Sequence, residues 1–292
     1  MLDVLRNALI ACRPKHWIKN LLVFALPLSD GLLIGMNFNP GALGRGIIVF
    51  CCLSAMSSAN YIFNDIRDLE HDRQHAKKKT RPFAAGNLST GLGLFIATGL
   101  VSFSTAFSLL IEGGVWRYIL FFGALQIAYT LVLKHISGYD LVALSLLYVF
   151  RAIIPATYEP IGLSKWFLVI FFAGALFLAS GKRYAEIRYS SDVKTRKVLS
   201  SYNEMHLALW VGISLSLLII SYLNWIFTFT DNSSFLTLLA SFVPISVLLI
   251  RVSSLTLSEQ GEDPTKVIFR QKDNFLLVAI WLALYLVGKG YL

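Results

Sequence analysis

Long apolar runs, separated by short polar segments, repeat along the whole chain. Each run has roughly 15–22 residues, close to the ~20 that an α-helix needs to cross a bilayer. In lipid every backbone hydrogen bond must be satisfied within the protein, so the runs predict membrane-spanning helices. The first run is the weakest because Pro27 and Asp30 interrupt it. The nine predicted spans cover residues 20–36, 41–63, 89–111, 115–133, 138–157, 164–181, 205–227, 233–253 and 273–290.

The composition agrees with a chain that is solvated by lipid. Of the 292 residues, 56% are hydrophobic and 15% are charged, and the mean hydropathy is +0.64. Soluble domains average about 25% charged residues. A secreted domain, a nucleic-acid-binding module and a disordered chain are therefore excluded. Because nine spans leave only short connections, we expect a single polytopic domain over residues 1–292.

The positive charges lie mostly in alternate loops. Of the 26 Lys and Arg residues, 21 lie at the N-terminus and in the loops that would share its side, and four lie on the other side. By the positive-inside rule, this asymmetry predicts a cytoplasmic N-terminus in the inner membrane and agrees with an odd number of spans. The cytoplasmic loops 64–88 and 182–203 are longer and more polar than the others. We expect the functional site in these loops, at the cytoplasmic face.

The second span runs into a cluster of acidic residues. If the helix continues past residue 63, one face carries five polar side chains at i, i+3, i+4, i+7 and i+11, namely Tyr61, Asn64, Asp65, Asp68 and Asp72. Carboxylates on one stripe repel one another unless a cation lies among them, and Mg²⁺ takes such hard oxygen ligands when it also binds substrate phosphates. The stripe therefore indicates a Mg²⁺ site. The alternative is a solvated helix end whose acids pair with Arg67 and Arg73.

A basic segment follows the acids and completes a recognisable pattern. Residues 75–82 read His-Ala-Lys-Lys-Lys-Thr-Arg-Pro. With the N-D-x-x-D-x-x-x-D stripe, this segment resembles the first signature of the UbiA superfamily of intramembrane prenyltransferases, and the resemblance covers essentially the whole chain. It implies an all-α bundle, typically of nine spans, that binds a diphosphate through Mg²⁺. The implied metal ligands are Asn64, Asp68 and Asp72, and the implied catalytic acids are Asp65, Asp68 and Asp72.

The segment after the sixth span departs from the usual superfamily pattern. Residues 181–188 read Gly-Lys-Arg-Tyr-Ala-Glu-Ile-Arg, where most members carry a second acidic motif. This segment, with residues 13–20, 129–135 and 151–153, resembles the decaprenyl-phosphate phosphoribosyltransferase branch. That resemblance implies transfer of phosphoribose from 5-phosphoribosyl 1-diphosphate to a polyprenyl phosphate. In the branch's basic segment, Lys78 and Arg81 keep the charges that would bind substrate, while Ala76 replaces a proline.

Substrates with a diphosphate, a 5-phosphate and a lipid phosphate need more cations than one metal site supplies. Arg151 is the sharpest candidate because it lies within an apolar span, although pairing with Asp140 or Glu159 is an alternative. Lys182 and Arg183 follow the sixth span, and an i, i+4 pair between Lys182 and Glu186 is the alternative there. Further candidate substrate contacts are Tyr61, Lys15, Lys19, Tyr129 and Lys134, of which the last four are equally explained by membrane topology or an interfacial position.

Two other functions stay open from the sequence alone. A prenyltransferase acting on an aromatic acceptor would need a second acidic motif, and a transporter or lipid-binding protein would place its charges near the bilayer midplane. We expect Mg²⁺ as cofactor, and a polyprenyl phosphate, 5-phosphoribosyl 1-diphosphate and the bilayer as partners. Nucleic acid is not an expected partner, and a homo-oligomer is neither required nor excluded. Because a phosphate monoester is largely ionised at neutral pH, we expect no general base and no catalytic histidine.

Overall fold

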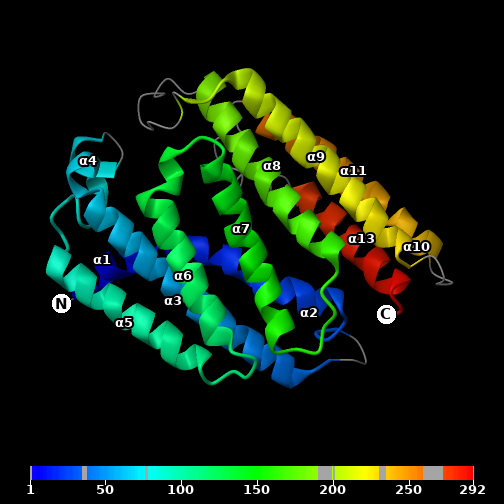
Figure 1. The fold of residues 1–292 in the computed structure, drawn as a ribbon, viewed down its shortest axis with the longest axis horizontal. Coiled ribbons are helices and arrows are strands. Elements are labelled where there is room, and N and C mark those ends of the chain that lie inside the picture. Colours follow the sequence, from blue (N-terminus) through cyan, green and yellow to red (C-terminus); the bar gives the residue numbers. More distant parts are fainter. Residues whose placement is uncertain are drawn as a thin grey trace. The chain divides into compact units, whose positions relative to one another are not determined.

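The computed structural model describes residues 2–34, 38–75, 78–189, 199, 201–229, 235–258 and 272–291. Within these residues the chain forms helices joined by turns, without any strand (Figure 1). Seven helical segments are long and apolar enough to cross a membrane: Pro40–Arg67, Thr90–Ser108, Val115–His135, Tyr139–Thr157, Lys165–Tyr189, Glu204–Phe227 and Phe235–Thr256. The expectation of an all-α, multi-pass membrane protein is confirmed.

The expected count of nine spans is not confirmed. The last apolar helix, α13 (Lys272–Gly288), is shorter than the seven long segments. The first predicted run is divided between a 3₁₀ helix, η1 (Pro14–Phe24), and the short helix α2 (Ala25–Ser29). The chain then turns at Gly31, where φ is +79° and an added Cβ would lie 2.8 Å from the ring of Tyr291. Proline and a left-handed glycine therefore prevent one continuous helix in this region.

The chain folds as two compact units. The first unit comprises residues 1–27, 39–131 and 150–161, and the second comprises residues 28–38, 132–149 and 162–292. The first contains α1 (Leu2–Cys12), η1, α3 (Pro40–Arg67), α4 (Leu69–Gln74), η3 (Lys78–Thr80), α5 (Thr90–Ser108), α6 (Val115–Leu131) and η5 (Ile154–Thr157). The second contains η4 (Leu133–His135), α8 (Lys165–Tyr189), α9 (Glu204–Phe227), α10 (Phe235–Ala240), α11 (Phe242–Thr256) and α13, and α7 (Tyr139–Ile153) contributes to both. The expectation of a single polytopic domain stays a prediction.

Helix α3 is the centre of the first unit, where it packs against α1, η1, α5 and α6. Close packing depends on glycines, since a Cβ at Gly123 would lie 2.7 Å from the sulfur of Met56. Near the polar end of α3, Ile62, Phe83 and Leu88 form a buried apolar cluster. This cluster fixes the end of α3 against the segment that follows α4.

Polar contacts join η1 to α3. The indole Nε1 of Trp17 donates to Ser58 Oγ at 3.0 Å, and Asn20 Nδ2 donates to Ser54 Oγ at 3.0 Å. Ser54 and Ser58 lie one turn apart on the same face of α3. The later residue of η1 contacts the earlier serine, so η1 runs antiparallel to this helix.

In the second unit α8 packs closely against α9 and also contacts α11. Leu141, Leu176 and Leu207 form a buried cluster from α7, α8 and α9. A Cβ at Gly181 would lie only 2.0 Å from the methyl group of Thr256. The glycine therefore permits α8 to approach α11 directly before Lys182 and Arg183.

Candidate functional site

The acidic stripe of the first unit lies on two helices that meet at Asp68. Helix α3 ends at Arg67 and α4 begins at Leu69, with Asp68 at φ −88° and ψ 9° between them. The backbone N–H of Asp68 still donates to the carbonyl of Asn64 at 2.9 Å, so the turn is tight. The helix therefore does not continue regularly through the stripe, contrary to the condition under which all five side chains share one face.

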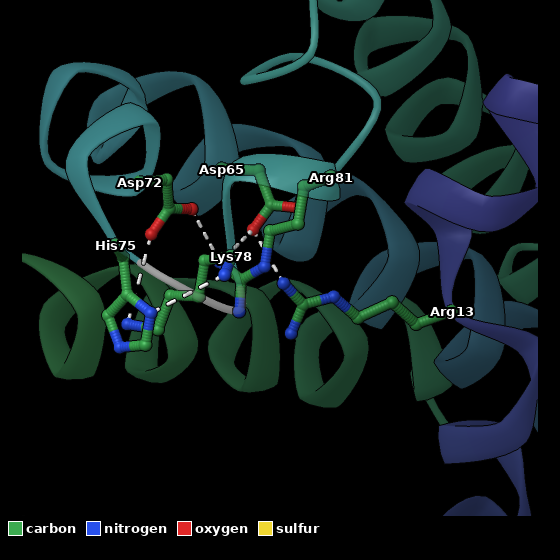
Figure 2. Close-up of polar contacts among 6 residues, drawn as sticks. All are labelled: Arg13, Asp65, Asp72, His75, Lys78 and Arg81. Carbon is green, nitrogen blue, oxygen red and sulfur yellow. Dashed lines mark hydrogen bonds and ion pairs between the residues drawn. The ribbon is translucent and has the colours of Figure 1, made fainter. Parts of the chain in front are cut away.

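Arg81 nevertheless joins the two ends of the stripe. Its Nη1 lies 3.1 Å from Asp65 Oδ1 and 2.6 Å from Asp72 Oδ2, so one guanidinium contacts a carboxylate from each helix. Both aspartates are buried. Figure 2 shows Arg81 beside both carboxylates, with Arg13 approaching Asp65 separately. The basic segment after α4 thus folds back onto the acids that precede it.

Arg13 is a member of this cluster that the sequence analysis did not select. Its Nη2 lies 2.6 Å from Asp65 Oδ1, and its guanidinium lies 4.9 Å from the centre of the Tyr61 ring. Among the described residues it is the only one other than glycine with a positive φ, 52°. A non-glycine residue in this conformation is strained, and such strain is often found at functional sites. Its place in the segment 13–20 was the one sequence signal available.

Lys78 approaches the cluster from η3. Its Nζ lies 3.8 Å from Asp72 Oδ1, and its backbone N–H donates to His75 Nδ1 at 3.4 Å. Asp72 Oδ1 is a buried atom without a hydrogen-bond partner among the described residues. The cluster of Arg13, Asp65, Asp72, Lys78 and Arg81, hereafter the acid–base cluster, therefore keeps one carboxylate oxygen available as a ligand.

The acid–base cluster has the donor chemistry that a hard divalent cation requires. Carboxylate and amide oxygens are the preferred ligands of Mg²⁺, and the orphaned oxygen of Asp72 is one of them. Asn60, one turn before Asn64, also has a buried amide oxygen that accepts no hydrogen bond within the described ranges, and the sequence analysis did not single it out. In the described part of the chain, however, no three acidic, cysteine or histidine side chains are already arranged around one point. A metal ion can therefore bind at this cluster only if an aspartate gives up a present contact with Arg13, Lys78 or Arg81.

The alternative explanation of the acidic stripe, pairing with Arg67 and Arg73, is not what the structure shows. Arg67 donates to the carbonyls of Thr130 and Leu131 at the end of α6. Arg73 pairs with Glu70 at 2.8 Å on the surface. These two arginines therefore cap a helix and form an exposed ion pair, which leaves Asp65 and Asp72 to Arg13, Arg81 and Lys78.

Arg151 lies elsewhere in the first unit, and neither acid considered in the sequence analysis is its contact. Its Nε donates to Asn20 Oδ1 at 2.8 Å, and its guanidinium lies 4.7 Å from the centre of the Phe122 ring. Glu159 instead accepts two hydrogen bonds from Arg45, at 2.7 and 2.8 Å. The side chain of Arg151 is buried, as expected for a charge within a span.

The second unit holds Lys182 and Arg183 together with acids. Arg183 Nε lies 3.2 Å from Asp140 Oδ2, and its Nη1 lies 3.1 Å from Glu186 Oε2. Lys182 lies 3.9 Å from Glu186, so the i, i+4 pair is present. The negative charge of Asp140, which lies 43 residues earlier in the chain, offsets the positive charge of Arg183. The end of α8 is therefore less positive than its own sequence suggests.

Tyr202 completes this second cluster. Its hydroxyl donates to Asp140 Oδ1 and accepts a hydrogen bond from the backbone N–H of Gly138 at 2.7 Å. Burial, together with the hydrogen bond to Asp140, raises the pKa of Tyr202 to about 12. Tyr202 therefore stays neutral at physiological pH and acts as a donor to the carboxylate.

The remaining predicted residues lie at several places. Asn64 and Asp68 are half-buried at the end of α3, and Tyr129 is half-buried on α6. Lys15 is exposed and Lys19 is half-buried, both on η1. Lys134 lies on η4 in the second unit. Ala76 lies outside the described residues.

These clusters differ in what they can do chemically. The acid–base cluster combines buried carboxylates with guanidinium and ammonium groups, which suits a metal ion and a phosphorylated ligand bound together. Arg151 offers a buried planar cation. Neither arrangement contains a nucleophile paired with a general base.

A sequence model of the UbiA prenyltransferase family matches residues 23–287. Several similar proteins are named decaprenyl-phosphate phosphoribosyltransferase. The one from Corynebacterium glutamicum is 34% identical, over 93% of this chain and 83% of that protein. The one from Mycobacterium tuberculosis is 32% identical, over 94% of this chain and 91% of that protein.

A solved structure shares the fold. The UbiA homolog from Archaeoglobus fulgidus, bound to GPP and Mg²⁺, superposes with a TM-score of 0.73 at 14% sequence identity. The superposition covers 97% of this chain and 99% of the archaeal chain.

Proposed function

This chain belongs to the UbiA prenyltransferase family, and from that premise we propose that it is a membrane-embedded phosphoribosyltransferase. It transfers phosphoribose from 5-phosphoribosyl 1-diphosphate to a polyprenyl phosphate, a decaprenyl-like lipid, and releases pyrophosphate. The names of relatives that match more than nine-tenths of the chain support this choice of substrates.

One structural observation supports the same choice over aromatic prenyl transfer. The end of α3 and the acid–base cluster bring several acids together where a metal–diphosphate could bind, whereas the end of α8 presents Lys182 and Arg183 with Glu186 and no pair of acids of its own. A second metal-binding motif is therefore missing from α8. Cations at this position suit a substrate that carries further phosphates.

The proposed cofactor is Mg²⁺. Asn64, Asp68 and Asp72 are the proposed ligands, and Asp65 supports them through its contacts with Arg13 and Arg81. When bound, the ion supplies charge stabilisation for the leaving pyrophosphate. Oδ1 of Asp72 supports this assignment because it is a buried oxygen whose ion-pair partner among the described residues, Lys78, lies 3.8 Å away, too far for a hydrogen bond.

The reaction exchanges one bond at the ribose. An oxygen of the lipid phosphate attacks C1, and the bond between C1 and the diphosphate oxygen breaks with its electron pair on the leaving group. Lys78 and Arg81 bind the diphosphate and stabilise the charge that develops on it. The attacking phosphate is already ionised, so the step needs no protein base.

The other predicted residues are assigned to binding. Tyr61 supports the guanidinium of Arg13, and Arg151 binds a further substrate phosphate. We assign Lys15, Lys19, Tyr129, Lys134, Lys182 and Arg183 to phosphate binding as well. We also propose an inner-membrane location with the N-terminus in the cytoplasm, on the basis of the loop charges.

A comparison of two labelled donors tests the proposal. Purified protein is incubated with Mg²⁺ and polyprenyl phosphate, together with ribose-labelled 5-phosphoribosyl 1-diphosphate, and the lipid is extracted. Parallel reactions contain a labelled prenyl diphosphate and a hydroxybenzoate acceptor. We expect ribose label in the extracted polyprenyl lipid and no prenyl label on the hydroxybenzoate. Label on the aromatic acceptor, without transfer of ribose, would establish the prenyltransferase function instead.

A further inference from the structure

Arg151 is held by two neighbours that leave its guanidinium little rotational freedom. Asn20 Oδ1 accepts the hydrogen bond from Nε at 2.8 Å, and the guanidinium stacks over Phe122 at 4.7 Å. Phe122 itself is fully buried on α6. One contact fixes an edge of the guanidinium and the other fixes its plane.

Asn20 is in turn held in a single orientation. Its amide Nδ2 donates to Ser54 Oγ at 3.0 Å while its Oδ1 accepts from Arg151, and only 1% of the residue is exposed. If the amide were flipped, its NH₂ would face the N–H of Arg151, and two donors would oppose each other. The chain Ser54–Asn20–Arg151 therefore transmits the position of α3 to a residue on α7.

The polar contacts between α3 and the N-terminal segment show where this chain lies relative to the acids. Ser54 contacts Asn20, Ser58 contacts Trp17, and Asp65 contacts Arg13. Eleven residues separate Ser54 from Asp65, which is about 16 Å along an α-helix. The Ser54–Asn20 contact that holds Arg151 is therefore about three turns of α3 away from Asp65 and the acid–base cluster.

We propose that Asn20 is a positioning residue, which holds the guanidinium of Arg151 for a substrate phosphate other than the one bound at the acid–base cluster. The inference rests on the proposed function, because it needs Arg151 to bind phosphate. Bidentate recognition of phosphate depends on the plane and direction of the guanidinium, and a buried side chain without a fixed edge loses both. Asn20 does not touch the substrate in this account.

Asn20→Leu tests the proposal, since leucine has a similar size and removes both polar atoms. We expect the KM for one phosphorylated substrate to rise about tenfold, the effect of losing a hydrogen bond to a charged group, with a smaller change in kcat. Loss of the thermal shift that this substrate induces in the purified protein checks binding without turnover. Unchanged KM values and an unchanged shift would refute the role of Asn20.

A double-mutant cycle separates positioning from simple support of the fold. Arg151→Gln alone should raise the same KM, and Asn20→Leu added to it should raise that KM no further. Additive effects would show that Asn20 acts independently of Arg151. If Arg151→Gln changes neither KM, the proposed function of Arg151 fails; if only Asn20→Leu is silent, the positioning inference fails alone.

Two further variants guard against a general loss of stability. Gln126→Leu is the matched control, because it removes another buried amide of the first unit, one that donates to Ser57 at 3.3 Å. Gln126→Leu should lower Tm while leaving unchanged the KM for 5-phosphoribosyl 1-diphosphate and the KM for polyprenyl phosphate. A rise in KM as large as that of Asn20→Leu would contradict the proposal. If Asn20→Leu does not fold, Ser54→Ala removes only the anchor of Asn20 and should raise the same KM by a smaller factor. An unchanged KM in Ser54→Ala would contradict the positioning role of Asn20.

Discussion

Asp65 and Asp72 are buried carboxylates whose charges are matched by cations: Arg81 contacts both, Lys78 contacts Asp72, and Arg13 contacts Asp65. Removal of one partner from a buried ion pair costs about 3–5 kcal/mol, because the other charge is left uncompensated. Substitutions of Arg81 or Asp72 therefore disturb folding and function together. Asp68 is half-buried at the junction of α3 and α4, so it separates the two effects better.

Asp68→Asn should abolish transfer while the protein still inserts and keeps its Tm within a few degrees. The substitution removes a proposed metal ligand and keeps the size of the side chain. Activity is measured over a range of Mg²⁺ concentrations, with Glu70→Gln as a control in the exposed pair with Arg73. Near wild-type turnover at limiting Mg²⁺ would show that Asp68 is not a ligand.

Lys182 and Arg183 are adjacent, yet their alanine variants should behave differently. The Arg183 side chain is 6% exposed and contacts Asp140 and Glu186, so Arg183→Ala leaves a buried carboxylate and should destabilise the protein by about 3–5 kcal/mol. The Lys182 side chain is 35% exposed, and its pair with Glu186 is of the kind worth about 0.3–0.5 kcal/mol. Lys182→Ala should therefore keep Tm and raise the KM for a phosphorylated substrate. Thermal denaturation and steady-state kinetics distinguish them, and a large loss of Tm in both variants would contradict this assignment.

The sequence identified the acids and Arg81 because they lie close together along the chain in a recognisable pattern. It missed the contacts of Arg13 and Asn20, and it considered Asp140 for Arg151 and not for Arg183, because the partners lie 52, 131 and 43 residues away. Each of these three residues has an ordinary explanation in sequence: a topology charge, a polar helix residue and a helix N-terminal acid. Only the packing within each unit shows what they contact: η1 against α3 and Arg151 in the first, and α7 against α8 in the second.

At the scale of elements, the periodicity of α3 was predictable and its end was not. The i, i+4 spacing places Ser54 and Ser58 together against η1, and Tyr61 and Asp65 together against Arg13. The end of α3 at Arg67, with Asp68 as the junction to the short helix α4, does not follow from that spacing. Acids in the first turn of α4 and Arg67 in the last turn of α3 complement the two helix dipoles. Such termini depend on local capping, which hydrophobic periodicity does not report.

The hydroxyl of Tyr202 links the turn before α7 to the segment before α9, so Tyr202→Phe should loosen both. Loss of a hydrogen bond to a charged group costs about 1.5–3 kcal/mol. Because the pKa is raised from 10.0 to about 12, the stabilisation is complete below about pH 10 and is lost as the pH rises through 12. The Tm difference between wild type and variant should stay constant from pH 7 to about pH 10. A difference that disappears within this range would contradict the hydrogen bond to Asp140.

At the scale of the whole molecule, apolar composition was sufficient to predict an all-helical membrane protein. The number of crossings was harder, since η1 and α2 divide the first apolar run and α13 is shorter than the seven long segments. Apolar length alone does not show whether such segments cross a bilayer. The two compact units could not be read from the sequence, because three of their boundaries, after residues 27, 131 and 149, fall within predicted apolar spans and not in linkers.

The charge distribution predicts that the N-terminus and the loop 64–88 lie on the cytoplasmic side. Cysteine variants at Lys15 and Lys79, in a background without the native cysteines, should be labelled by an impermeant thiol reagent only in inverted vesicles. A cysteine at Arg117 is the matched control and should be labelled only in right-side-out cells. Labelling of Lys15 and Arg117 variants from the same side would contradict the predicted orientation.

The fate of each phosphate of the donor shows whether this protein transfers phosphoribose. 5-Phosphoribosyl 1-diphosphate is labelled either at its 5-phosphate or at its terminal diphosphate phosphorus, and each form is incubated with the purified protein, Mg²⁺ and polyprenyl phosphate. We expect the 5-phosphate label to enter the lipid while an equal amount of the diphosphate label appears as free pyrophosphate, and neither to happen without the lipid phosphate. Diphosphate label in the lipid, or no label in the lipid from either form, would contradict phosphoribosyl transfer by this protein.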